Sequence, residues 1–280
     1  GTVRYINLPT SSYMSYITEA INKWGKCRTG AITMYGAGVG VYGNSGYAYT
    51  GSTPSKLKKR IEEANSSNAE ITDINITENG NYVIILGGSG YWTLGYPDAF
   101  LKKLEQYRTG DLRDDNILSA CFNDRGEWVV ITDKHYSYSN ETIKNFILKA
   151  EELYEEVYYA YITNYGMIAC CKNGVYYKNI PSNLAEALKK LTFKPKVIKF
   201  TDNGLYLITD GESQNYYFRF SSVRLNRLRN KLLANYLKSG GNELATVRIS
   251  AFCVAMLSNN SFICKYSIFF RKYELSAAVL

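Results

Sequence analysis

The sequence predicts an α+β fold made of tandem ββ(β)α repeats, and three observations support this prediction. Turn glycines fall at positions 36, 80, 126, 166 and 204, in steps of 44, 46, 40 and 38 residues. A short aromatic segment follows each turn region, and an apolar pattern with helical spacing follows each aromatic segment. Such regular spacing is typical of repeat proteins, in which one small unit cannot bury its apolar face without its neighbours.

Each repeat begins with two apolar runs that flank a turn. In the second repeat, Ile71–Thr77 and Tyr82–Leu86 alternate like strands on either side of Asn79-Gly80. Asn-Gly between two such runs is a strong hairpin signal, and in a two-residue hairpin turn both residues take a positive φ. The same chemistry recurs at Asp124-Arg125-Gly126, Asn164-Tyr165-Gly166 and Asp202-Asn203-Gly204. We therefore predict a hairpin at the start of every repeat.

A third strand follows each hairpin through a glycine-rich connection. The clearest match between repeats is that of Gly43–Ala48 with Gly87–Trp92. A phosphate-binding loop would need Gly-Lys-Ser/Thr between a strand and a helix. Because these glycines separate one strand from the next strand, we interpret Gly87–Gly90 as a structural connection.

An amphipathic helix closes each repeat. Thr53-Pro54 and Ser222 are typical of helix starts. Apolar residues at helical spacing mark five helices with one apolar face each, which we expect to cover a sheet. The five series are Leu57, Ile61, Ala64; Phe100, Leu101, Leu104, Tyr107; Ile143, Phe146, Ile147, Ala150, Tyr154; Leu184, Ala187, Leu188, Leu191; and Leu225, Leu228, Leu232, Tyr236.

The two ends of the chain predict a sixth unit. Residues 3–26 are typical of a third strand and helix without a hairpin, whereas Ala245–Phe252 and Phe262–Phe270 are typical of a hairpin alone. We predict that these parts complete one unit of a closed, propeller-like ring of six, because closure removes exposed sheet edges. The alternative is an open array of five units with a C-terminal cap. The single domain, residues 1–280, divides at about 31–66, 70–110, 117–156, 157–192, 196–239, and 244–280 together with 3–26.

Few residues suit catalysis or metal binding. The six cysteines include no CxxC pair and His135 is the only histidine, so the sequence lacks a zinc-ligand set. His135 has no counterpart in the other repeats, and we expect Asp114-Asp115 in a solvated loop and Glu151–Glu156 at a solvated helix end. We therefore predict no metal, no cofactor and no catalytic residues.

Two further features bear on partners and stability. Cys253 and Cys264 are equidistant from the centre of the last hairpin, which is compatible both with a disulfide and with two buried thiols. The net charge of +8 suits an anionic partner, and basic residues are densest in Arg224–Lys231. No apolar run approaches the roughly 18 residues of a membrane-spanning helix. The sequence assigns neither a compartment nor an oligomeric state.

The aromatic residues of the third strands are the candidate binding surface. Neighbours along a strand point to opposite faces, so one residue of a pair can be buried and the other exposed. We expect a non-enzymatic binding or scaffold protein that presents this surface to a protein or a glycan. The alternatives are nucleic-acid binding through the basic surface and an enzyme whose site is assembled from several repeats. The candidate residues are Tyr47, Tyr49, Tyr91, Trp92, Tyr136, Tyr138, Tyr176, Tyr177 and Tyr216.

Overall fold

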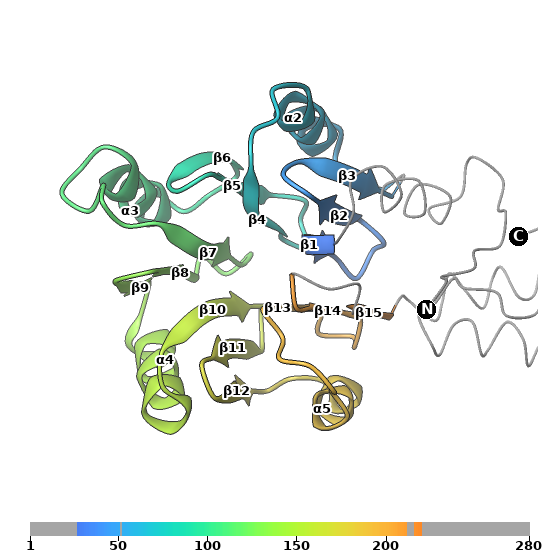
Figure 1. The fold of residues 1–280 in the computed structure, drawn as a ribbon, viewed down its shortest axis with the longest axis vertical. Coiled ribbons are helices and arrows are strands. Elements are labelled where there is room, and N and C mark those ends of the chain that lie inside the picture. Colours follow the sequence, from blue (N-terminus) through green and yellow to red (C-terminus); the bar gives the residue numbers. More distant parts are fainter. Residues whose placement is uncertain (1–26, 51, 212–215, 220–280) are drawn as a thin grey trace, which may run out of the picture.

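The computed structural model describes residues 27–50, 52–211 and 216–219. Within these residues, five antiparallel sheets of three strands follow one another, and a helix follows each of the first four sheets (Figure 1). This arrangement confirms the predicted α+β repeats. The helix predicted after the fifth sheet, with Ser222 at its start, lies outside the described residues.

Each sheet has its strands in chain order, so every unit is a simple meander. The first unit contains β1 (Cys27–Ile32), β2 (Gly38–Tyr42), β3 (Gly46–Tyr49) and α2 (Ser55–Ser66). The second contains β4 (Ile71–Ile76), β5 (Tyr82–Leu86), β6 (Gly90–Leu94) and α3 (Asp98–Arg108). The third contains β7 (Ile117–Phe122), β8 (Trp128–Thr132), β9 (Tyr136–Tyr138) and α4 (Glu141–Tyr154).

The remaining units follow the same plan. The fourth contains β10 (Val157–Ile162), β11 (Met167–Cys171), β12 (Gly174–Lys178) and α5 (Ser182–Lys189). The fifth contains β13 (Val197–Phe200), β14 (Tyr206–Thr209) and β15 (Tyr216–Arg219). The glycine-rich segment Gly87–Gly90 joins β5 to β6, as the sequence predicts for a structural connection.

Four of the five hairpin turns differ in type from the predicted two-residue turn, whereas in the fourth unit Thr163 donates to the Gly166 carbonyl at 2.9 Å and the loop has two residues. Gly80 donates its N–H to the Thr77 carbonyl at 2.9 Å, and Thr77 donates to the Asn81 carbonyl at 2.8 Å. The positive φ belongs to Gly80 (+82°) and not to Asn79. The loop therefore has three residues, a β-turn followed by a left-handed glycine, which also suits the twist of the flanking strands.

The apolar faces of the helices lie against the sheets, as the sequence predicts. Leu57, Ile61 and Ala64 of α2 are fully buried and belong to the core between the first two units. The second strands are buried on both faces, and β8 has no exposed residue. Burial on both faces explains their continuous apolar sequences, because each sheet lies between two neighbours.

The first strand of each unit lies nearest the centre of the molecule (Figure 1). Neighbouring units meet through these strands, since β4 contacts β1 and β7, and β10 contacts β7 and β13. The fifth unit in turn contacts the first, because β13 and β14 lie against β1 and the Thr209 hydroxyl donates to the Cys27 carbonyl at 2.8 Å.

This contact overturns the predicted place of the sixth unit. A six-unit ring needs a sheet between the fifth unit and the first, but among the described residues these two units touch directly. No closed ring of six is therefore seen. Residues 3–26 and 244–280, which the prediction assigned to that sheet, lie outside the described residues, as do Cys253 and Cys264.

A buried ion pair crosses the centre. The Lys199 ammonium, on β13, donates to Asp73 Oδ1 on β4 at 2.7 Å and to the Ile74 carbonyl at 2.9 Å. It also donates to the Asn75 side chain. The Lys199 and Asp73 side chains are 0% and 1% exposed, so this pair links the second and fifth units where water cannot compete.

The other three units complete this central network. Thr29 of the first unit and the Ala120 N–H of the third unit both donate to Asp73, at 3.2 Å. The rings of Tyr159 and Tyr161, in the fourth unit, lie 5.3 and 5.2 Å from the ammonium nitrogen, within the range of a cation–π interaction. All five units therefore contribute to one buried polar cluster.

Candidate functional site

The predicted binding surface, the third-strand aromatics, lies against the helices. In three units the tyrosine hydroxyl donates to a glutamate on the helix that closes the same unit. These pairs are Tyr49 with Glu62 (2.7 Å), Tyr91 with Glu105, and Tyr136 with Glu151 (2.9 Å). The repeated bond attaches the third strand to its helix, which is a structural role.

Of the other third-strand aromatics, some contact neighbouring side chains and one is exposed to solvent. Tyr47 stacks on Tyr49 with ring centroids 5.4 Å apart, and Arg60 lies over the Trp92 ring. Tyr176 contacts Phe146 of α4, and Tyr138 packs on the same core. Tyr177 is 38% exposed, and the side chain of Tyr216 lies outside the described residues. A binding role for this set stays a prediction.

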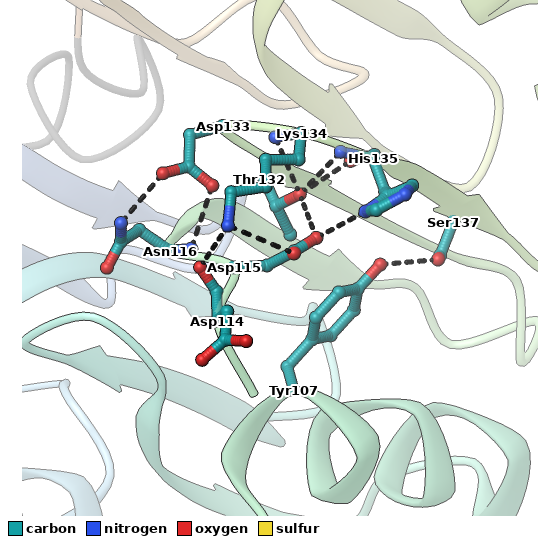
Figure 2. A network of polar contacts seen from close by, with 9 residues as sticks. All are labelled: Tyr107, Asp114, Asp115, Asn116, Thr132, Asp133, Lys134, His135 and Ser137. Carbon is teal, nitrogen blue, oxygen red and sulfur yellow. Dashed lines mark hydrogen bonds and ion pairs between the residues drawn. The ribbon is translucent and has the colours of Figure 1, made fainter. Parts of the chain in front are cut away.

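His135 belongs to a polar network around Asp115 and Thr132, at the corner between β8 and β9 (Figure 2). Its Nδ1 lies 2.6 Å from Asp115 Oδ2, and the Thr132 hydroxyl donates to the same oxygen at 3.0 Å. The Asp115 side chain is 4% exposed, whereas that of His135 is 56% exposed. Asp115 is thus buried and satisfied by hydrogen bonds, and the predicted solvated loop is wrong for this residue, although Asp114 is exposed.

This network has a structural role, and no buried cysteine that the structure describes suits the part of a nucleophile beside it. An imidazole held by a buried carboxylate is one part of a catalytic triad, which also needs a nucleophile. The cysteines of the described residues are all buried, and burial raises the pKa of Cys27 and Cys121 to about 12. Asn116, next to Asp115, bonds with both its backbone and its side chain to Asp133, so the cluster fastens the linker after α3 to the β8–β9 corner (Figure 2).

A second group of residues forms what we call the turn face. It consists of the five hairpin turns between the first and second strands, residues 34–36, 78–80, 124–126, 164–166 and 202–204. Each of the first four turns, or the residue just before it, is hydrogen-bonded to the turn of the next unit. These bonds run from the Met34 N–H to Glu78 (2.8 Å), the Asn79 N–H to Asp124 (3.3 Å), the Asp124 N–H to Asn164 (3.2 Å), and the Thr163 hydroxyl to Asp202 (2.5 Å).

The residue before each turn glycine points to solvent. These residues are Tyr35, Asn79, Arg125, Tyr165 and Asn203, and all are exposed. Tyr35 and Tyr165 are 76% and 72% exposed, the two most exposed large apolar side chains among the described residues. Turn positions usually carry small or polar residues, so two exposed aromatic rings at equivalent turns need another explanation.

The position one residue earlier carries three carboxylates, Glu78, Asp124 and Asp202. Burial raises the pKa of Glu78 to about 7; the Met34 N–H opposes this shift, and the charges of Asp202 and Asp124 add to it. Burial also raises the pKa of Asp202 against its hydrogen bonds. Asp124 Oδ1 is buried and has no hydrogen-bond partner within the described residues. None of the three carboxylates is ion-paired with a described lysine or arginine.

The sequence contained a signal for this face that the prediction did not use. Tyr35 and Tyr165 stand immediately before turn glycines, where each hairpin has its tip. The prediction instead weighed aromatic residues by their recurrence on the third strands. Recurrence in every repeat indicates a structural role, whereas an aromatic residue in only some turns indicates a role outside the fold.

Comparison with protein-family models, with curated proteins and with solved structures found no match. Over the described ranges, no helix has the length and apolar character needed to cross a membrane. In the same part of the chain, no three side chains of His, Cys, Asp or Glu are grouped so that they could hold a metal ion.

Proposed function

We propose that this chain is a non-enzymatic binding protein that presents its turn face to a protein partner. The observation that carries the proposal is the high exposure of Tyr35 and Tyr165 at equivalent turns of the first and fourth units. Tyrosine is enriched among the residues that dominate binding energy at interfaces, because its rigid ring offers apolar area and a polar tip. Neither ring is needed by its turn, because backbone bonds hold both turns. Gly36 has a positive φ and donates to the Thr33 carbonyl at 3.2 Å, and Thr163 donates to the Gly166 carbonyl at 2.9 Å.

We also propose that the five described units close into a ring of five. Support comes from the contact of β1 with β13 and β14 and from the Lys199–Asp73 pair across the centre. Closure would hold the five turns in a fixed arrangement. A preformed surface loses little conformational entropy when it binds, so this geometry suits a docking face.

Other partners are less compatible with this face. A nucleic acid would bring phosphate charges towards Glu78, Asp124 and Asp202, which repel them. The basic residues that favoured nucleic-acid binding in the sequence, Arg224–Lys231, lie outside the described residues. A glycan would be expected on the third-strand aromatics, most of which contact helices.

The test is a binding screen of the full chain on a peptide array, a glycan array and a set of single-stranded oligonucleotides. We expect peptide ligands whose affinity falls at least tenfold in the Tyr35→Ala/Tyr165→Ala variant, since truncating an interface tyrosine commonly removes this much. The matched control is Tyr96→Ala, which removes an exposed tyrosine between β6 and α3 and should leave binding unchanged. Ligands found only among glycans or oligonucleotides, or peptides that bind the double variant normally, would overturn the proposal.

A further inference from the structure

We propose that the partner segment is cationic, and that the turn face holds a lysine or arginine side chain of that segment with the carboxylates of Glu78, Asp124 and Asp202. This inference rests on the proposed function of the turn face and adds the chemistry of its partner. Three independent features of the face support it.

The first feature is charge without a counter-ion. Several exposed glutamates on the helices have a lysine one helical turn away, as in the pairs Lys144–Glu141 and Lys149–Glu152. On the turn face the three carboxylates come from three different units and lack such partners among the described residues. Arg125 is the one cation among the five turns, and its guanidinium donates to the Asn164 carbonyl at 2.9 Å. Acidic groups therefore outnumber basic ones on this face, although the chain as a whole carries +8.

The second feature is the unsatisfied oxygen of Asp124. Its Oδ2 accepts the Asn79 N–H at 3.3 Å, but Oδ1 is buried and accepts no hydrogen bond from the described residues. Buried polar atoms almost always have partners in a functional state, supplied by protein, water or ligand. An ammonium or guanidinium group donates several hydrogen bonds and carries the complementary charge. Because Oδ1 is buried, the partly exposed Asp124 side chain would have to rotate to offer this oxygen to the cation.

The third feature is the pair of exposed rings. Cations bind to the faces of aromatic rings, and this protein contains several such contacts, with Lys58 over Tyr49 at 5.2 Å and Arg108 over Tyr91 at 5.4 Å. Tyr35 follows Met34, which is bonded to Glu78, and Tyr165 follows Asn164, which accepts from Asp124. The rings and the carboxylates thus belong to the same linked turns, and a basic segment would meet both.

The test uses the full chain and three labelled octapeptides, octa-arginine, octaglutamate and an uncharged Gly-Ser peptide, with binding followed by fluorescence anisotropy at physiological salt. We expect octa-arginine to bind most tightly and to lose at least tenfold in affinity in Glu78→Gln/Asp124→Asn. These substitutions keep an acceptor for the backbone N–H groups of Met34 and Asn79. The matched control, Glu152→Gln on α4, neutralises an exposed acid that is not part of any turn and should change affinity less than twofold.

The pH dependence adds a readout that a general loss of structure would not produce. Binding of octa-arginine should tighten between pH 6 and pH 8, because Glu78 must lose its proton to hold a cation. The titratable groups near Glu78 are Asp124, Asp202 and the buried Tyr161, whose pKa burial raises well above 10 so that it stays neutral. A flat profile in the wild type would count against the inference.

The outcomes separate the inference from the proposed function. Octaglutamate or the Gly-Ser peptide binding as tightly as octa-arginine would overturn the cationic partner, and so would unchanged affinity in Glu78→Gln/Asp124→Asn. In either case, array peptides that are lost in Tyr35→Ala/Tyr165→Ala would still support the turn face as the binding surface. If the double neutral variant fails to fold, as judged by circular dichroism, Glu78→Gln alone carries the same test, with at least a threefold loss expected.

Discussion

The first strands contribute to both the centre of the molecule and its turn face. Charged side chains are ion-paired at the centre and, within the described part of the chain, lack ion pairs at the turn face. At the centre, Lys199 and Asp73 are fully buried and each is paired with the other. At the turn face, only five residues along the chain from Asp73, Glu78 is half-buried and has no ion pair among the described residues. A buried charge has to be neutralised within the fold, whereas a charge at the rim can be left for solvent or a partner.

The tyrosines show the same contrast. Those of the third strands bond to helices of their own unit, as Tyr136 does with Glu151. Tyr35 and Tyr165 point away from the fold instead. We therefore expect side chains that bond within their own repeat to stabilise the fold, and exposed side chains at the turns to be available for binding a partner. Substitutions at the centre should therefore cost the most stability, and substitutions at the turns the least.

The largest effect is expected from breaking the central pair. Lys199→Met leaves the Asp73 carboxylate buried without a counter-ion and should lower the free energy of unfolding by about 3–5 kcal/mol. Urea denaturation of the full chain measures this. The exposed Lys189→Met of α5, which breaks a surface pair with Glu186, should leave the free energy of unfolding unchanged within error.

A double variant sharpens this prediction. Lys199→Met/Asp73→Asn removes both charges, so it should be more stable than Lys199→Met alone, because the remaining polar group no longer carries an unpaired charge. Equal loss in the two variants would mean that packing at the centre, and not charge pairing, determines the effect.

Breaking the bond between a third strand and its helix should have a smaller effect on stability. Tyr136→Phe removes a hydroxyl that donates to Glu151 and accepts the Val157 N–H at 3.1 Å. We expect a loss of about 1–2 kcal/mol, the usual value for hydrogen bonds of this kind. Tyr177→Phe, at a more exposed site of β12, is the control and should be neutral. If Tyr136→Phe left the free energy of unfolding unchanged, the distinction between tyrosines bonded to a helix and exposed tyrosines would be weakened.

The repeats could be predicted from sequence because every local signal agreed. The glycines before Ala37 and Asn81 mark left-handed turn positions, and Leu57, Ile61 and Ala64 mark one face of a helix. Such signals depend on neighbours a few residues away. The number of units around the centre could not be predicted, because it depends on the angle between adjacent sheets, which no short segment specifies.

The site was harder to predict than the fold for a related reason. The alternation of a strand tells which neighbours face opposite sides, but it does not tell which side a helix covers. Tyr91 and Tyr136 were therefore plausible surface residues until their glutamate partners were known. Likewise, Asp115 was expected in solvent, because its partner His135 lies twenty residues away and on another element.

The pH dependence of stability gives the next prediction. The pKa of Glu78 rises from its ordinary 4.5 to about 7 in the folded protein. The folded state therefore binds the proton more tightly than the unfolded state, and the stability that this gives is full below pH 4.5 and lost as pH rises through 7. Because Glu78 is partly exposed, we expect the loss to be only about 1 kcal/mol. In Glu78→Gln, the free energy of unfolding should fall less over the same range; parallel profiles would show that Glu78 does not cause it.

Substitution of the two exposed turn tyrosines should have the smallest effect on stability and the greatest effect on binding. Tyr35→Ala/Tyr165→Ala removes two side chains that are mostly in water, so the free energy of unfolding should change by no more than about 0.5 kcal/mol. A loss above about 1 kcal/mol would instead place the rings among the structural contacts, as with Tyr136, and would remove the ground for a binding role. Neutral stability together with lost peptide binding is the one combination that a purely structural tyrosine cannot give, because a residue that only supports the fold affects binding through unfolding.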